Sequence, residues 1–436
     1  MPTLWADRLP RHRYPAGTVR LFLRGILEAA VSQRGVAAFL RLLAPCLPAP
    51  VANTGRWWLL RLGLYELTRS KQQADDWVWI MDHTIQLGPW KCLIIVGIRL
   101  SAWESQQRGP LEHEDVALLN LTPMEHSSGE EVENQLRATV AQTRPPRAIL
   151  TDGGADLKSG IERFSKDYRG VAHVRDIKHK GATLLKRRLE ADPRWQAFSA
   201  RANQTKREVT QTRLAYLNPP AQKNKARYMN LDSLVSWGRK ALEFLAHPQA
   251  VAAEAVDYAV LTKKLGWLRE YGEALKEWSE WLALVQAAEG YVRREGFHAH
   301  AVAELQRELI PLATGLVAGE LCGELLAFVG EQSAQARPGE RLLGSSEVIE
   351  SVIGKYKRLQ GTHSQGGMTA MLLSIGAIVA SKTTGMVRDA LTATPTRNVL
   401  EWCHHHLGIT LQAQRCLAFS GNKTGIQTGP HQDLSF

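Results

Sequence analysis

Two short apolar segments that each end in an aspartate constrain this chain more than any other feature of its sequence. Residues 77–82 (WVWIMD) and 148–152 (AILTD) have the length and the apolar content of buried strands. Two glycines follow the second segment, so the chain can turn directly after Asp152. If the two strands are parallel neighbours, Asp82 and Asp152 lie side by side at the carboxyl edge of one sheet, where α/β proteins gather their ligands.

The sequence around these two strands predicts a mixed sheet of five strands. Apolar runs at 91–100, 116–121 and 171–174 supply the other strands, and helices are expected at 130–142 and 155–166. Three strands in succession, followed by helix, strand, helix and strand, is the order of an RNase H-like α/β domain. A helix with a last acidic residue normally follows the fifth strand in this fold, but here that order is interrupted.

A long helical segment causes the interruption. From about 180 to 338 the sequence predicts almost only helix. An aromatic stripe within it recurs at helical spacing, and we interpret this stripe as core rather than as a platform for nucleic-acid bases. Its members are Trp267, Tyr271, Leu275 and Trp278. Beyond Gly339 the pattern changes, and two closing helices are expected at 346–359 and 366–381.

The N-terminal part of the chain predicts a helix-turn-helix. Helical spacing of apolar residues from 18 to 43 is followed by a proline-rich break and a third helix at 53–66. The third helix would be the recognition helix, with Arg56 and Arg61 as DNA contacts. A plain helical bundle is the alternative interpretation.

These patterns divide the chain into five parts. They are an N-terminal helix-turn-helix-like domain at 1–73, the first part of the catalytic domain at 74–185, an all-α insertion at 186–340, the closing helices of the catalytic domain at 341–420, and a disordered tail at 421–436.

The charge of the chain favours a polyanionic partner. The formal charge is +11 at pH 7, and many of the cations lie between residues 178 and 227. A surface that neutralises phosphates and a solvated helix face are both open interpretations of this run. The five cysteines are scattered, and no apolar run is long enough for a membrane span. We therefore expect a cytoplasmic, nucleoid-associated bacterial protein.

Three segments resemble the acid-bearing motifs of DDE transposases. They are 79–84 (WIMDHT), 149–154 (ILTDGG) and 344–351 (GSSEVIES). The third resembles the Ser-Ser-x-x-x-Glu pattern of transposases whose catalytic domain holds a large helical insertion, as in the hAT type. This match places the glutamate of the family on Glu350, with Glu347 as the alternative third acid. The Tyr- and Arg-containing signature of another insertion-sequence group is missing, so the subfamily stays open.

The resemblance implies an active site and a reaction. Asp82, Asp152 and Glu350 would hold two Mg²⁺ or Mn²⁺ ions. The enzyme would cleave DNA at transposon ends and join the freed 3′-hydroxyl to target DNA, without a nucleophilic side chain of its own. Paired ends imply a homodimer or a higher oligomer on double-stranded DNA. The DNA contacts expected near the acids are His179, Lys180, Lys186, Arg187, Lys355, Lys357 and Arg358.

Other functions remain compatible with the same sequence. An RNase H-like nuclease, or a catalytically inactive domesticated transposase, would share the fold. A helix-turn-helix regulator with a helical partner-binding domain would tolerate the loss of both aspartates. A purely helical scaffold would leave the strands at 77–176 unexplained.

Overall fold

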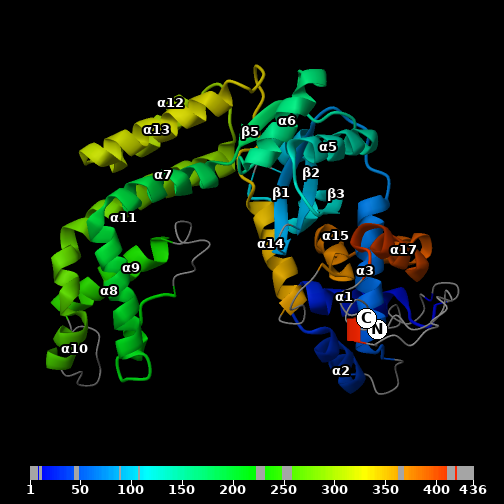
Figure 1. Cartoon of the computed structure of the whole chain (residues 1–436), viewed down its shortest axis with the longest axis horizontal. Coiled ribbons are helices and arrows are strands. Elements are labelled where there is room, and N and C mark those ends of the chain that lie inside the picture. The colour runs from blue at the N-terminus through cyan, green and yellow to red at the C-terminus, as the bar shows by residue number, and fades with distance from the viewer. Residues whose placement is uncertain are drawn as a thin grey trace.

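A mixed five-stranded sheet organises the protein, with strand order β3-β2-β1-β4-β5. The computed structural model describes residues 8, 12–43, 49–87, 90–106, 109–221, 231–247, 258–361, 368–409 and 418–419. The strands are β1 (Trp77–Leu87), β2 (Trp90–Arg99), β3 (Ala117–Met124), β4 (Ala148–Thr151) and β5 (Ala172–Arg175). Strand β2 is antiparallel to both of its neighbours, β1 and β3, whereas β4 and β5 run parallel to β1 (Figure 1). All five predicted strands are present, in the predicted order.

Strand β1 is longer than the sequence predicted. It continues beyond Asp82 to Leu87, because the residues after Asp82 pair with β2 across a hairpin. Thr84 faces Cys92 in this pairing. The polar residues after Asp82 therefore did not end the strand, and Asp82 lies inside β1 rather than at its end. Strand β4 pairs with β1 only from Val78 to Ile80, so Asp82 lies just beyond the parallel pairing.

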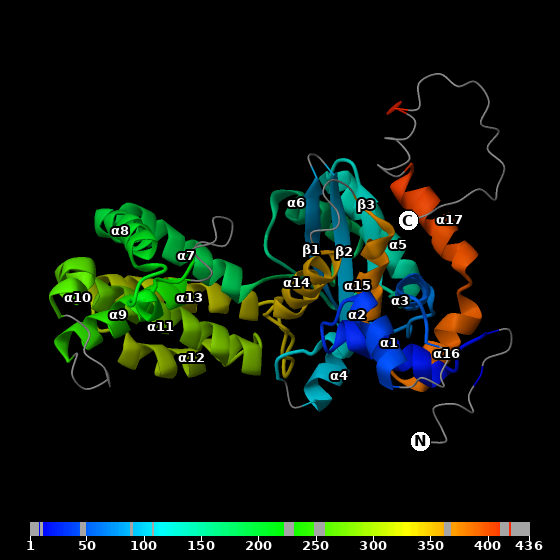
Figure 2. The same ribbon diagram turned by 90° about the horizontal axis from the view of Figure 1, so that it is seen from below.

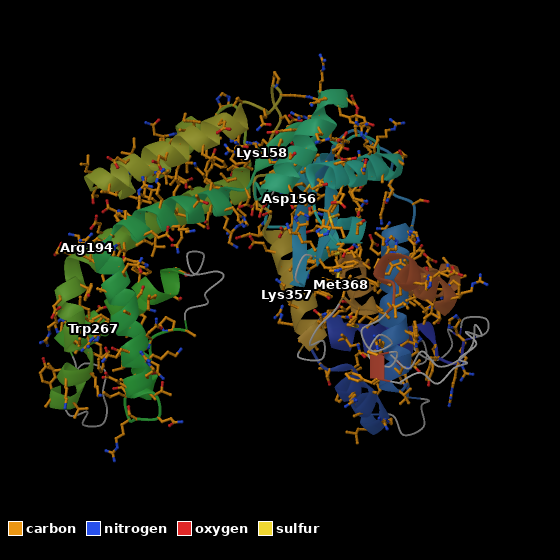
Figure 3. The ribbon with its side chains drawn as sticks, in the orientation of Figure 1. Asp156, Lys158, Arg194, Trp267, Lys357 and Met368 are labelled. Atoms are coloured by element: carbon orange, nitrogen blue, oxygen red, sulfur yellow. The ribbon has the colours of Figure 1, made fainter. Side chains whose placement is uncertain are left out.

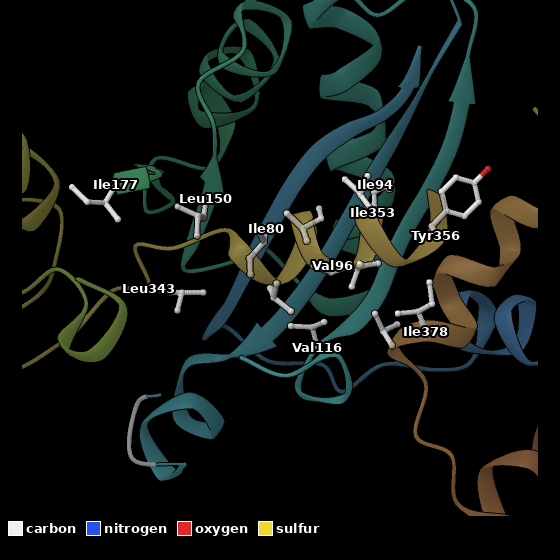
Figure 4. Close-up of a cluster of buried hydrophobic side chains, with 14 of the residues drawn as sticks. Ile80, Ile94, Val96, Val116, Leu150, Ile177, Leu343, Ile353, Tyr356 and Ile378 are labelled. Atoms are coloured by element: carbon white, nitrogen blue, oxygen red, sulfur yellow. The ribbon is translucent and has the colours of Figure 1, made fainter. Parts of the chain in front are cut away.

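Helices cover both faces of the sheet. Because successive side chains of a strand point to opposite faces, Trp79 and Ile80 belong to two different cores. Trp79 packs beneath α5 (Gly129–Thr143) and α6 (Ala155–Asp167). Ile80 packs on the other face, beside α14 (Glu347–Gln360), where Figure 4 shows it in one apolar cluster with Ile353 and Tyr356. The predicted helices at 130–142, 155–166 and 346–359 are confirmed.

The predicted helical segment forms an arm beside the sheet (Figure 2). Its α-helices are α7 (Ile177–Ala191), α8 (Pro193–Val209), α9 (Leu231–Ala246), α10 (Tyr258–Leu265), α11 (Gly272–Glu295), α12 (Ala301–Leu309) and α13 (Leu316–Ser333). The aromatic stripe is core, as predicted: Trp278 is buried against Trp195, and Trp267 packs on Phe198. A bridge between Phe297 and Leu342 marks the return of the chain towards α14.

The third N-terminal helix is not a free recognition helix, and the sequence-based expectation is wrong on this point. The helices of this region are α1 (Ala16–Leu27), α2 (Gln33–Leu43) and α3 (Ala52–Thr68). Helix α3 packs against α1, α2, β3 and the C-terminal helices α15 (Ser374–Val379), α16 (Thr384–Ala393) and α17 (Thr396–Leu407). Its exposed residues are Asn53 and Thr68. Apolar residues around most of a helix indicate burial on several sides, and spacing alone could not identify what covers them.

The two predicted DNA contacts on α3 are engaged inside the protein. Arg61 donates from Nε to the carbonyl of Thr394 at 2.6 Å, and from Nη2 to the carbonyl of Leu391. Burial lowers the pKa of Arg56. Neither guanidinium therefore extends into solvent from an uncovered helix face.

Two predicted regions near the C-terminus have different outcomes. The expected helix at 366–381 is a 3-10 turn, η9 (Ala370–Leu373), followed by the short α15, and residues 362–367 lie outside the described part of the chain. The predicted disordered tail at 421–436 also lies outside the described residues. No helix in the described part of the chain is long and apolar enough to span a membrane. The domain boundaries stay predictions.

Helix α3 meets η9 and α15 with direct backbone contact. A Cβ atom at Gly63 would lie 1.7 Å from the carbonyl oxygen of Leu373. A Cβ atom at Gly376 would lie 2.3 Å from the carbonyl oxygen of Gly63. The N-terminal and C-terminal helices can therefore pack this closely only with glycine at both positions.

We expect Gly63→Ala to lower the free energy of unfolding by about 2 kcal/mol or more, because the methyl group forces the two backbones apart. The midpoint of urea unfolding measures the change. The matched control is Gly323→Ala in α13, where a Cβ would meet nothing within 4 Å. That variant should gain about 0.5–1 kcal/mol, as alanine does in an open helix position. An unchanged midpoint for Gly63→Ala would contradict the close packing of α3.

Candidate active site

Three acidic residues from distant parts of the sequence meet at one edge of the sheet. Ile80 of β1 pairs with Leu150 of β4 in parallel register, so Asp82 and Asp152 lie level with each other two residues further on. Glu350 lies in the first turn of α14, which packs against β1. The structure thus brings together the three residues that the sequence identified as the catalytic acids.

The three carboxylates interact electrostatically. Burial raises the pKa of Asp82 to about 7, and the negative charges of Asp152 and Glu350 add to the increase. The backbone N–H of His83, 2.6 Å from Asp82 Oδ1, and the imidazole of His179 act in the opposite direction. A raised carboxyl pKa with like-charged neighbours is typical of catalytic and metal-binding clusters.

The geometry favours Glu350 over Glu347 as the third acid. Glu350 Oε2 accepts a hydrogen bond from Lys178 Nζ at 2.7 Å. Its Oε1 is buried without a hydrogen-bond partner, 3.7 Å from His179 Nδ1. Glu347 instead accepts from Arg293 of α11 at 2.7 Å. Glu350 therefore offers an uncommitted oxygen beside Asp82, whereas Glu347 is held by the helical arm.

Asp176 positions the elements around the site. Its side chain is 1% exposed and caps α7 by accepting from the backbone N–H of His179 at 2.8 Å. It also accepts from the backbone N–H of Ser346 at 2.6 Å and from the Ser346 hydroxyl at 2.8 Å. Although burial opposes the change, the side chain of His179 and the backbone N–H groups of Ser346 and His179 lower the pKa of Asp176. One ionised carboxylate thus fixes the start of α14, and with it Glu350.

Two cations at the start of α7 balance the acids. Although burial opposes the change, Asp176 and then Glu350 and Asp152 raise the pKa of His179 to about 9. Lys178 lies 2.7 Å from Glu350 and 3.8 Å from Glu347, and its pKa is raised, against the effect of burial, by Glu350 first. Both side chains therefore carry positive charge next to the carboxylates at neutral pH.

The donor set fits a hard divalent cation. Mg²⁺ prefers carboxylate oxygens, and an unpartnered buried oxygen on Glu350 and a carboxyl of raised pKa on Asp82 both gain from a nearby positive charge. Within the described residues, however, no three His, Cys, Asp or Glu side chains lie in an arrangement that could hold a metal ion. In this arrangement Lys178 occupies one carboxylate oxygen of Glu350, so only the other oxygen is without a hydrogen-bond partner.

The basic run of α7 is largely engaged within the arm. Arg187 donates to Glu324 of α13, Lys186 lies 3.9 Å from Glu190, and Lys180 Nζ lies 5.6 Å from the centre of the Phe328 ring. Lys186 and Arg187 are nevertheless exposed. The charge run therefore stabilises the packing of α7 on α13 as well as presenting cations to solvent, a division that the sequence alone did not indicate.

Comparison with known proteins gives little further information. No protein-family model matches the sequence, and no curated protein matches it. One solved structure that resembles this chain is the Drosophila P element transposase strand transfer complex, with a TM-score of 0.42 and 9% sequence identity. The match covers 87% of this chain and 94% of that one. A similarity of this size does not establish a shared fold or a shared function.

We expect Asp82→Asn to raise the free energy of unfolding of the metal-free protein at pH 8 by about 1–3 kcal/mol. The pKa of Asp82 is about 7 in the folded protein against 3.8 for an ordinary aspartate. The native state then binds more protons than the unfolded state between these values, so the parent loses stability as the pH rises from about 4 to about 7. Urea unfolding in EDTA at pH 5 and pH 8 measures the effect.

The gain from Asp82→Asn should be smaller at pH 5 than at pH 8. Asp75→Asn is the control, because Asp75 is exposed just before β1. The change in the free energy of unfolding caused by Asp75→Asn should be small and similar at both pH values. An Asp82→Asn protein with the same pH dependence as the parent would show that Asp82 does not carry the raised pKa.

Proposed function

We propose that this chain is a DDE-class DNA transposase, which cleaves transposon ends and joins the freed 3′-hydroxyl to target DNA. The observation that carries the proposal is the electrostatic coupling of Asp82, Asp152 and Glu350, together with the unpartnered buried oxygen of Glu350. Three carboxylates from three separate elements, gathered where the parallel pairing of β1 and β4 ends, suit the binding of phosphodiester substrates through divalent cations.

The sheet order supports an RNase H-like catalytic domain. Three antiparallel strands are followed by two strands parallel to β1, and the helix with the third acid comes last. The helical arm separates β5 from α14 in sequence, as expected for a catalytic domain with a large insertion. Asp176 and Ser346 then hold the two ends of the arm together.

The residues around the site have distinct roles in this proposal. Asp82, Asp152 and Glu350 would hold two Mg²⁺ or Mn²⁺ ions, which would stabilise the attacking and leaving oxygens of an in-line displacement at phosphorus. Lys178 neutralises Glu350 when no metal is bound, and must release Oε2 for that oxygen to become a ligand. His179 keeps a positive charge near the substrate phosphates. No side chain is required as a nucleophile.

The observations weigh differently on the alternatives. A nuclease, or an inactive relative, shares the fold and the acids. Only an assay of DNA cleavage and joining distinguishes it from a transposase. A helix-turn-helix regulator is disfavoured, because α3 is covered by the C-terminal helices and Arg61 is bonded to backbone carbonyls. The proposal keeps double-stranded DNA as partner and a homodimer or higher oligomer on paired ends.

We expect the parent protein to cleave or join DNA that carries the sequences flanking its own gene, with Mg²⁺ or Mn²⁺ and not with EDTA. Asp82→Asn, Asp152→Asn and Glu350→Gln should each lower the rate about 100-fold or more, because each removes a charged ligand of the reacting centre. Glu347→Gln should keep the rate within about tenfold of the parent. Gel analysis of end-labelled DNA measures cleavage and joining separately.

Different outcomes separate the candidate functions. Cleavage without joining would favour the nuclease. Loss of activity in Glu347→Gln but not in Glu350→Gln would identify Glu347, and not Glu350, as the third acid. A parent that binds DNA but shows no metal-dependent cleavage on any end sequence would contradict an active transposase.

A further inference from the structure

We propose that one uncovered face of α14 binds the sugar-phosphate backbone of duplex DNA through a phosphate strip formed by Ser351, Lys355 and Arg358, with His113 behind it. The inference rests on the proposed function, since it names how that active site would receive its substrate. It goes beyond the cations expected from the sequence by adding His113 and Ser351 and by defining the face of the helix.

The three residues share one side of the helix. Ser351, Lys355 and Arg358 follow i, i+4 and i+7, and a rise of 1.5 Å per residue spreads them over about 10 Å. Gly354 lies on the same side, and a Cβ built there would meet nothing within 4 Å. No described residue therefore covers this side of α14, and the length of the strip corresponds to about three phosphates of one DNA strand at about 3.4 Å of duplex axis per charge.

Hydrogen bonding directs the Ser351 hydroxyl outward. Lys355 Nζ lies 3.5 Å from Nδ1 of His113, and Nε2 of His113 lies 2.9 Å from Ser351 Oγ. An ammonium group can only donate, so Nδ1 accepts and the Nε2–H donates to Ser351. Ser351 is exposed, and its own proton is then free to donate to a phosphate oxygen. Burial and the nearby cations hold the pKa of His113 at about 4, so its ring is neutral at pH 7, as this pattern requires.

Among the described residues, the positive charges of the strip exceed the negative charges near them, although Glu28 and Glu114 act on Lys355. Lys382 pairs with Glu114 at 3.0 Å, and Arg24 pairs with Glu28 at 2.7 Å, so both nearby acids already have partners. Lys355 and Arg358 make no ion pair with any described residue. Burial lowers the pKa of Lys355, and Lys382 and Arg358 lower it further. A bound anion would relieve this repulsion, and a polyanion would satisfy both cations at once.

The position of the strip favours DNA over a small anion. Ser351 directly follows Glu350, so a backbone that lies along the strip leads to the carboxylates. The strip is open and linear and does not enclose a single phosphate. In Figure 3, Lys357 marks the far part of α14, whereas Lys158 lies on α6, which covers the opposite face of the sheet. Lys158 is therefore a suitable control for a general loss of positive charge.

Binding of a fluorescent 30-base-pair duplex to the full-length protein in EDTA, followed by anisotropy between 50 and 200 mM salt, tests the strip without cleavage. We expect Lys355→Gln and Arg358→Gln each to weaken binding about 3- to 10-fold and to reduce the slope of log K against log salt by about 1. Ser351→Ala should weaken binding about 2- to 5-fold with an unchanged slope, because it removes a neutral donor. Lys355→Arg should restore the slope, and Lys158→Gln should behave as the parent.

If Lys355→Gln and Arg358→Gln both bind the duplex with the affinity and the salt dependence of the parent, the proposal that the strip binds DNA is wrong. The same loss of affinity in Lys158→Gln, or displacement of the duplex by millimolar inorganic phosphate at constant ionic strength, would also overturn it. Thermal melting of each variant separates loss of binding from loss of folding. Metal-dependent cleavage by the parent, with unchanged binding by the strip variants, rejects the strip and keeps the proposed function. Weakened binding without any cleavage by the parent supports the strip and rejects the function.

Discussion

The buried carboxylate of Asp176 is the interaction on which the rest of the candidate active site depends. It stands between the end of β5 and the start of α7, and it accepts hydrogen bonds from His179 and from both the backbone N–H and the hydroxyl of Ser346. Hydrogen bonds to a charged group contribute about 1.5–3 kcal/mol each, and an unpartnered charge would be costly at this depth. Asp176 therefore ties the point where the long helical arm leaves the sheet to the point where the chain returns at α14, and Arg147 adds a second tie to Glu340.

The same anchor explains how three acids can be held close together. Burial first, and then the charges of Asp152 and Glu350, raise the pKa of Asp82, so placing the three acids near one another costs electrostatic free energy. The cost is offset by Lys178 and His179, which α7 presents from the first turn after Asp176. The residue that fixes the glutamate helix thus also fixes the cations that balance it. A bound divalent cation would take over part of the charge neutralisation that Lys178 and His179 provide, because the carboxylates would coordinate it directly.

The terminal helices have a structural role beside this site. Helix α3 lies between the sheet and the C-terminal helices, and the glycine contact at Gly63 and Gly376 sets how closely they approach. The termini of the described chain therefore stabilise one common core together with β3. The proposed DNA contacts therefore lie on other surfaces, among them the face of α14 with Lys355 and Arg358.

The sequence alone determined the strands and most helices, because hydrophobic period is a local property. From the residue that ends each strand and from the resemblance of three motifs, it also predicted Asp82, Asp152 and either Glu350 or Glu347 as the acids of the site. It did not determine that β1 continues past Asp82, since that depends on pairing with β2 across the hairpin. Only the tertiary structure decided that α3 is buried, that Lys186 and Arg187 face acids of the arm, and that Glu350 rather than Glu347 faces Asp82. Those facts depend on which distant segments meet, and a helical or basic pattern is the same whether its partner is protein or solvent.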